Sequence, residues 1–257
     1  MNTMTLWHLT GWEFAALAFA ALLVGFSKTA VSGANTVSLA VFAAVLPARA
    51  STGVLLPILI AGDVIAVLVY RRHAHWPTLW RLFPAVAVGV VVGTVFLMWA
   101  DDAIVRTAIG AILLLMTAIT VVRRRKAARE DEPPAVTTRA GRVKARSYGM
   151  LGGFTTMVAN AGGPVMSLYL LSAGFRKLGF LGTSAFFFLI VNVAKVPFSA
   201  GLGLIDADSL LLDAALVLFV LPGALLGKWA VDRINQRLFE QIVIVATVVG
   251  ALQLLLR

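Results

Sequence analysis

The sequence predicts an all-α, polytopic membrane protein built from two inverted repeats, and three features carry this prediction. The first is composition: 60% of the residues are hydrophobic and only 13% are charged, which is outside the range of ordinary soluble domains. The second is a series of apolar runs of roughly 18 to 22 residues, the length that a helix needs to cross a bilayer. The third is that the same order of runs occurs twice along the chain.

Each half is expected to contain one interrupted apolar segment followed by three continuous spans. We divide the chain into a first membrane repeat (residues 1–122), a basic cytoplasmic linker (123–147) and a second membrane repeat (148–257). The first repeat has an interrupted segment from Gly11 to Leu46 and spans near Ser51–Tyr70, Leu79–Trp99 and Ala103–Val122. The second has an interrupted segment from Tyr148 to Ala173 and spans near Phe180–Leu202, Ser209–Val231 and Leu238–Leu256. Each interrupted segment is either a re-entrant hairpin or two complete crossings, and the sequence leaves both open.

Residues of the two halves match when one half is shifted along the other by about 128 positions. This shift places Gly25-Phe26-Ser27 on Gly153-Phe154-Thr155, and one more residue of shift places Gly53 on Gly182 and Asp63 on Asn192. Further along the chain, the pair Gly89/Gly93 matches the pair Gly223/Gly227. Glycines four residues apart in a membrane helix let a neighbouring helix approach closely. We therefore expect these glycines to lie at helix crossings.

The formal net charge of +10 does not indicate a nucleic-acid partner, because most basic residues flank apolar runs. Residues 123–146 hold nine Lys and Arg against three acidic residues, as expected for a cytoplasmic loop under the positive-inside rule. The loop at Arg71, Arg72 and Arg81 is also basic, whereas that at Asp101 is acidic. Successive loops lie on opposite sides of the membrane, so placing the basic loops inside and the acidic loop outside puts both termini outside the cell. The two halves therefore enter the membrane in opposite senses.

The two interruptions are rich in glycine and polar residues, which membrane helices tolerate where the backbone is buried in protein or lines an aqueous cavity. Paired interruptions of this kind indicate a transport site near the bilayer midplane. The helix that follows each break offers unpaired N–H groups to an anion. The candidate ligands from the breaks are Ser27, Lys28, Thr29, Asn35, Thr155, Asn160, Gly162 and Gly163. The alternative is that Lys28 snorkels to an interface and the polar residues cap broken helices.

Asp63, Asn192 and Lys195 lie inside continuous apolar spans. A buried charge in a membrane is costly enough to require a partner or a water-filled path. We expect Lys195 to bind substrate and Asp63 to carry a coupling proton. The alternative is a structural pair, either between Asp63 and Lys195 or with backbone carbonyls. Asn192 shares a helical face with Lys195 and binds the same ligand or makes an interhelical hydrogen bond.

Four segments of the chain resemble a known protein family. They are GFSKTAVSG (25–33), LPARASTGVLLPILIAGDVIAVLVYRRHAHW (46–76), NAGGPVMSLYLL (160–171) and FLGTSAFFFLIVNVAKVPF (180–198). They resemble the TauE/SafE family of sulfite and organosulfur-anion exporters, also known as toluenesulfonate uptake permeases. The resemblance covers essentially the whole chain and implies a bacterial-type inner-membrane permease with a duplicated helical unit. It also implies substrates such as sulfite or sulfoacetate.

These observations together predict a transporter of small, sulfur-containing anions that is secondary active and proton-coupled. The expected partners are the anion and the lipid bilayer, and a homodimer stays open. No metal, prosthetic group or other cofactor is expected. A passive anion channel is the first alternative. A membrane assembly subunit or intramembrane enzyme is the second, and the sequence offers no catalytic nucleophile or carboxylate dyad for the enzyme.

Overall fold

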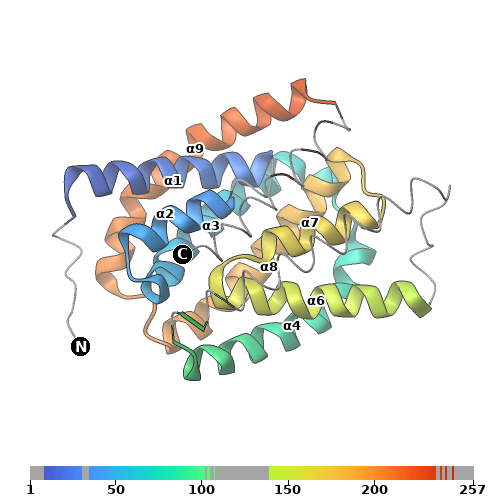
Figure 1. Ribbon diagram of the computed structural model, residues 1–257. Helices are drawn as coiled ribbons and strands as arrows, with labels where there is room; N and C mark the ends of the chain where they lie inside the picture. Colours follow the sequence, from blue (N-terminus) through green and yellow to red (C-terminus); the bar gives the residue numbers. More distant parts are fainter. Residues whose placement is uncertain are drawn as a thin grey trace.

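The computed structural model of the protein describes residues 9–30, 35–101 and 139–235, together with isolated positions 103, 104, 107, 238, 241 and 245. Every element in the described residues is helical (Figure 1). The helices are α1 (Gly11–Thr29), α2 (Asn35–Val45), α3 (Ala48–Tyr70), η3 (Arg71–His73), α4 (Trp76–Trp99), α6 (Arg139–Ala159), α7 (Gly162–Ser172), α8 (Lys177–Gly201) and α9 (Ala207–Arg233).

Local sequence signals account for several helix ends. Helix α1 begins with a capping box, in which Thr10 and Glu13 satisfy each other's backbone N–H groups, and Asp206 and Ser209 do the same for α9; such reciprocal caps define a helix start. Helix α6 ends just before Asn160, whose φ of 53° lies in the left-handed region that commonly terminates helices. Helix α7 then begins at Gly162, so only two residues separate the two helices.

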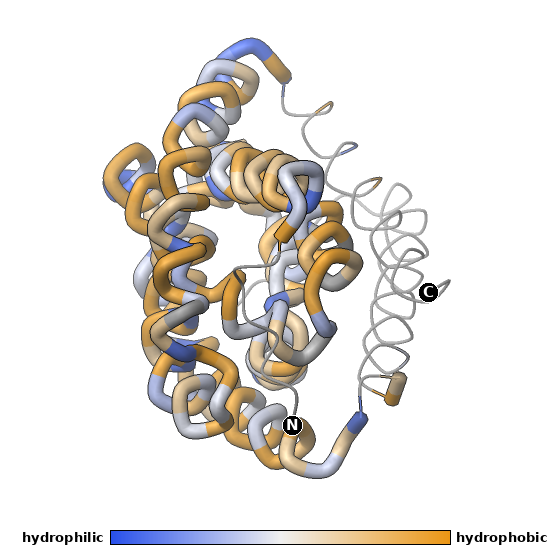
Figure 2. The backbone as a smooth tube through the Cα atoms, turned by 90° about the vertical axis from the view of Figure 1, so that its left-hand side faces the viewer, coloured by the Kyte–Doolittle hydropathy of each residue, from blue (hydrophilic) through white to orange (hydrophobic). Residues whose placement is uncertain are grey.

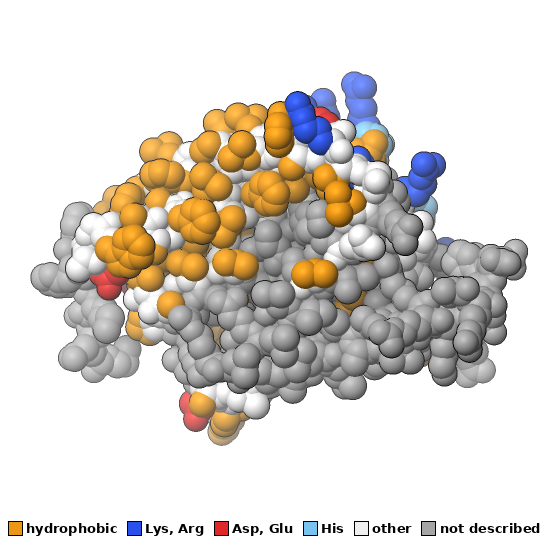
Figure 3. All heavy atoms as spheres, turned by 45° about the horizontal axis from the view of Figure 1, so that its top comes forward, with side chains coloured by type: hydrophobic (Ala, Val, Ile, Leu, Met, Phe, Trp, Pro, Cys, Tyr) orange, Lys and Arg blue, Asp and Glu red, His pale blue; other side chains and the backbone are white. Residues whose placement is uncertain are grey.

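Five helical segments among the described residues are long and apolar enough to cross a membrane. They are Gly11–Thr29, Ala50–His73, Trp76–Trp99, Lys177–Gly201 and Ser209–Arg233. Figure 2 views the helices close to end-on and shows hydrophobic residues along all of them. Figure 3 shows a broad hydrophobic face, with Lys and Arg side chains gathered at one end. An apolar surface of this size suits lipid rather than water, so the chain is an integral membrane protein.

Glycines mark two close helix pairs, α1 with α9 and α4 with α6. In the first pair, a Cβ atom on Gly25 would overlap the carbonyl oxygen of Val220, and one on Gly223 would overlap that of Leu22. In the second pair, the same holds for Gly153 against Val86 and for Gly89 against Met150. The prediction that the pairs Gly89/Gly93 and Gly223/Gly227 lie at helix crossings is therefore confirmed.

The order of these contacts gives the relative direction of the helices. Gly223 and Gly227 of α9 contact Leu22 and Phe26 of α1 in that order, so α1 and α9 run in the same direction. Helices α3 and α8 are antiparallel, because Gly53 near the start of α3 contacts Leu204 beyond the end of α8. At the opposite ends, Gly182 near the start of α8 contacts Tyr70 at the end of α3.

The observed helices match the expected spans where the structure describes them. The spans expected near Ala103–Val122 and Leu238–Leu256 fall almost wholly outside the described residues. Helix α6 begins at Arg139, within the stretch expected to be a linker, and continues to the second interruption. Its first turns are basic rather than apolar, which is why hydropathy placed the boundary later.

Candidate functional site

The ends of α1 and α6 meet the middle parts of α3 and α8 around a small cavity of about 20 Å³. A space of this size holds about one water molecule. Its lining combines polar side chains from both halves with an apolar wall. The lining residues are Ser27, Lys28, Asn35, Leu59, Asp63, Thr156, Asn160, Gly163, Leu181, Ser184, Ala185, Phe188 and Asn192.

Lys28 and Asp63 form an ion pair at this cavity. The Lys28 Nζ atom lies 2.7 Å from Asp63 Oδ1, and the exposed fractions of the two side chains are 10% and 0%. The ammonium also lies 4.6 Å from the centre of the Phe188 ring, a position that suits a cation–π contact. Lys28 therefore points into the protein, and the alternative that it snorkels to an interface does not hold.

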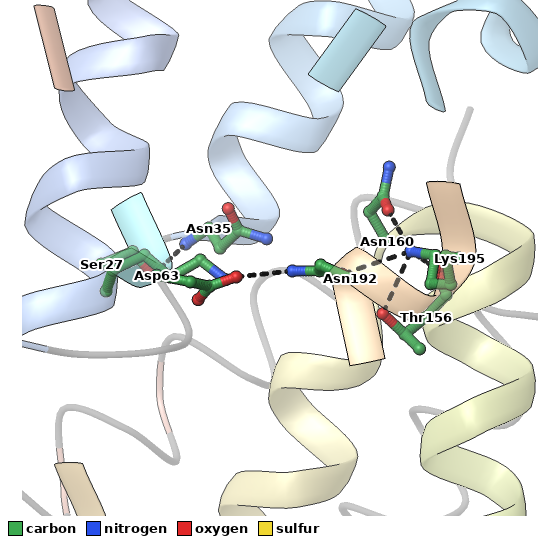
Figure 4. Close-up of polar contacts among 8 residues, drawn as sticks. Ser27, Asn35, Asp63, Thr156, Asn160, Asn192 and Lys195 are labelled. Carbon is green, nitrogen blue, oxygen red and sulfur yellow. Dashed lines mark hydrogen bonds and ion pairs between the residues drawn. The ribbon is translucent and has the colours of Figure 1, made fainter. Parts of the chain in front are cut away.

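Asn192 connects this ion pair to the second lysine (Figure 4). Its Nδ2 atom donates to Asp63 Oδ2 at 2.7 Å, while its Oδ1 atom lies 3.4 Å from Lys195 Nζ. This amide orientation matches the chemistry on both sides, because a carboxylate only accepts and an ammonium only donates. Asn192 thus makes an interhelical hydrogen bond, one of the two alternatives that the sequence left open, from α8 to α3, and it also lines the cavity.

Lys195 belongs to α8, and its side chain reaches the C-terminal end of α6. Unpaired carbonyl groups at a helix C-terminus favour a cation. The Lys195 Nζ atom donates to the backbone oxygen of Thr156 and to Asn160 Oδ1, each at 2.6 Å. A further contact of 3.4 Å reaches Thr156 Oγ1. The sequence left two structural alternatives for Lys195, an ion pair with Asp63 or contacts with backbone carbonyls. The structure shows the backbone contact, and Asp63 pairs with Lys28 instead.

Other predicted residues from the breaks lie beside this network. The backbone N–H of Asn35, at the start of α2, donates to Ser27 Oγ at 3.0 Å. Asn160 holds the second break against α3, because its Nδ2 atom donates to the backbone oxygen of Thr52 at 2.7 Å. Gly163, at the start of α7, lines the cavity.

Four predicted residues do not line the cavity: Lys195, which contacts residues of its lining, and Thr29, Thr155 and Gly162. The hydroxyl of Thr29 donates to the carbonyl oxygen of Ala224 at 2.8 Å and so faces α9. The hydroxyl of Thr155 donates within its own helix, to the carbonyl oxygen of Leu151 at 2.8 Å. Gly162 packs against the side chain of Thr156. Thr29 therefore lies on the face of α1 that packs against α9, and the Thr155 hydroxyl is hydrogen-bonded within α6.

The cavity also contains residues that the predicted site did not include, above all Thr156 and Ser184. Ser184 Oγ is buried and has no hydrogen-bond partner among the described residues. A signal for it exists in the sequence: Ser184, Phe188 and Asn192 are spaced by four residues, so they share one face of a helix. Thr156 is adjacent to Thr155 in the sequence, and its side chain lines the cavity.

Matching positions of the two halves line the cavity together. Under the sequence correspondence, Lys28 pairs with Thr156 and Asn35 with Gly163, and all four residues line it. The same holds for Asp63 and Asn192, and for Leu59 and Phe188. The two halves thus contribute matching positions to the lining, but the charged residues at these positions, Lys28 and Asp63, both come from the first half.

Comparison with known proteins identifies the family of the chain. No curated protein and no solved structure matches the chain. The family model described as "Sulfite exporter TauE/SafE" matches residues 17–254, which include every residue of the cavity. The chain belongs to the TauE/SafE sulfite exporter family, whose members export sulfite and related anions across a membrane.

Proposed function

We propose that the protein is a secondary active, proton-coupled transporter of small sulfur-containing anions such as sulfite or organosulfonates. The observation that carries the proposal is the buried group of Lys28, Asp63, Asn192 and Lys195 at a cavity between the two halves. Charged side chains inside membrane segments are rare and mark substrate or ion pathways. One lysine that lines the cavity and a second that contacts its lining residues suit an anion.

The anion site would comprise the predicted residues that line the cavity or contact its lining. These are Ser27, Lys28, Asn35, Asn160, Gly163, Asn192 and Lys195. Thr29, Thr155 and Gly162 would support the helices around it. The cavity has room for about one water molecule, so anion binding would require the surrounding helices to move apart.

Alternating access by two inverted repeats would supply that movement. The helix directions support this proposal, because α3 and α8 occupy matching positions in the two halves and are antiparallel. The close pairs support it too: α1 packs on α9 of the other half, and its counterpart α6 packs on α4. In this arrangement the protein would lie in the inner membrane, with both termini outside.

Asp63 is the proposed coupling residue. An anion that binds Lys28 must compete with the carboxylate that now contacts it at 2.7 Å. Protonation of Asp63 would remove its charge and release Lys28 for the anion. Anion binding and proton binding would then favour each other, which is the requirement for coupled transport.

The test is sulfite flux in vesicles that contain the purified protein, with a pH gradient across the membrane. We expect the wild type to concentrate sulfite at the expense of the gradient. Asp63→Asn should abolish the dependence on the gradient and retain anion binding, whereas the control Asp101→Asn, in an exposed loop, should behave as the wild type. Flux that only follows the sulfite gradient would identify a passive channel and contradict the proposal.

A further inference from the structure

We propose that a groove between α4 and α6 binds a phospholipid with an anionic headgroup. The two helices pack side by side (Figure 1), and the groove along them has a volume of about 870 Å³, which is in the range of ligand-binding sites. Among the described residues, it shares no lining residue with the cavity of the candidate anion site. Lipid binding here is therefore a property separate from the proposed transport.

Two arginines supply the charge of the groove, Arg81 from α4 and Arg146 from α6. Neither guanidinium forms an ion pair with an acidic residue in the described part of the chain. Arginine stays protonated in proteins, and its planar group donates two parallel hydrogen bonds to a phosphate. Ser147, which follows Arg146 and also lines the groove, has a hydroxyl that can donate to the same phosphate.

The packing of α4 on α6 places the two arginines at the same level. A Cβ atom on Gly149 would lie 3.1 Å from the carbonyl oxygen of Leu82, and Gly93, further along α4, approaches a later part of α6. The two helices therefore run in the same direction. Arg81 directly precedes Leu82, and Arg146 lies three residues, about one turn, before Gly149. The two guanidinium groups are thus placed to share one phosphate.

The groove becomes apolar further along the two helices. Val88 and Met150 line it there, and both side chains are exposed on the surface. Val88 lies seven residues after Arg81, which is about 10 Å along α4. Trp80, beside Arg81, is also exposed and lines the groove, and tryptophan is typical of the membrane interface. A phospholipid has the same order of chemistry, with its phosphate at the interface and its acyl chains deeper in the membrane.

The charge of the groove favours an anionic headgroup over a zwitterionic one. A zwitterionic headgroup carries its own cation, which two unpaired guanidinium groups repel. A headgroup with a net negative charge gains from both arginines without this cost. Basic pockets between membrane helices bind anionic headgroups for this reason.

The experiment compares phosphatidylglycerol with phosphatidylcholine of the same acyl chains, each added to the delipidated protein in detergent. Affinity is measured from the concentration dependence of thermal stabilisation. We expect the wild type to bind phosphatidylglycerol at least about 10-fold more tightly, the equivalent of one charged hydrogen bond. Glycerol 3-phosphate, which has a phosphate but no acyl chains, should not stabilise the protein at the same concentrations.

Charge variants test the role of the arginines. Arg81→Gln and Arg146→Gln should each weaken phosphatidylglycerol binding by about 10-fold or more and leave phosphatidylcholine binding unchanged. Arg72→Gln is the matched control, because Arg72 is exposed in η3, shortly before α4, and does not line the groove. It should bind both lipids as the wild type does.

A second pair of variants tests the groove without changing its charge. Val88→Trp fills the apolar part and should weaken phosphatidylglycerol binding. Val95→Trp should not, because Val95 is exposed on the same face of α4, two turns further along, and lies outside the groove.

Several results would overturn lipid binding at this groove. Equal affinity of the wild type for the two lipids would show that the headgroup charge is not recognised. A loss in Arg72→Gln as large as in Arg81→Gln would assign the preference to general surface charge. Stabilisation by glycerol 3-phosphate as strong as that by phosphatidylglycerol would identify a site for a soluble anion instead. The wild-type comparison and the valine pair decide even where an arginine variant does not fold.

Discussion

Loss of Lys28 should destabilise the fold through the charge that it leaves behind. In Lys28→Met the Asp63 carboxylate, which is 0% exposed, loses the ammonium 2.7 Å away. The Asn192 amide is then its remaining hydrogen-bond donor among the described residues. Removing one partner of a buried ion pair costs about 3–5 kcal/mol, because the other charge stays buried without compensation.

Removal of both charges should cost less than removal of Lys28 alone. In Lys28→Met/Asp63→Asn the side chain at position 63 is neutral and keeps an oxygen that accepts from Asn192. The remaining loss is the contact itself, about 1–2 kcal/mol. The two substitutions should therefore be non-additive by about 2 kcal/mol, which is the size expected for residues in direct contact.

The assay is equilibrium unfolding in mixed micelles of a mild detergent and dodecyl sulfate, without added anion. Lys228→Met is the matched control, because Lys228 is exposed on α9 and its loss should change the free energy of unfolding by less than about 0.5 kcal/mol. If Lys28→Met unfolds like this control, the ion pair does not exist in solution. Strictly additive effects of the two substitutions would also refute the reasoning.

Three further predictions concern helix packing, a helix end and topology. Gly223→Ala should lower the free energy of unfolding by about 1–3 kcal/mol through steric overlap, whereas Gly11→Ala, which has open space around it, should not; equal unfolding curves would exclude the close crossing. Tyr70→Phe should cost about 1–3 kcal/mol, because the hydroxyl donates to a backbone oxygen at the end of α1 at 2.7 Å, and rescue is not expected from added anion. Reporter fusions in the linker (residues 123–147) and after Arg257 should report opposite sides of the membrane, and the same side for both would contradict the inverted repeats.

The sequence by itself determined the class of the protein and the regions of the chain that line the cavity. Hydropathy located the described membrane helices within a few residues, since a span needs a run of apolar residues whatever its neighbours are. The glycine pairs indicated close crossings, because a missing Cβ permits backbone approach in any partner helix. The polar breaks after Gly25 and Gly153 indicated where the cavity forms.

Only the tertiary structure decided which charged groups meet. The sequence left open a pair between Asp63 and Lys195, whereas the structure pairs Asp63 with Lys28 and places the Lys195 ammonium at the end of α6. Likewise Thr156 lines the cavity and its neighbour Thr155 does not. The physical reason is that helical periodicity fixes which residues share a face, whereas the packing of neighbouring helices fixes where that face points.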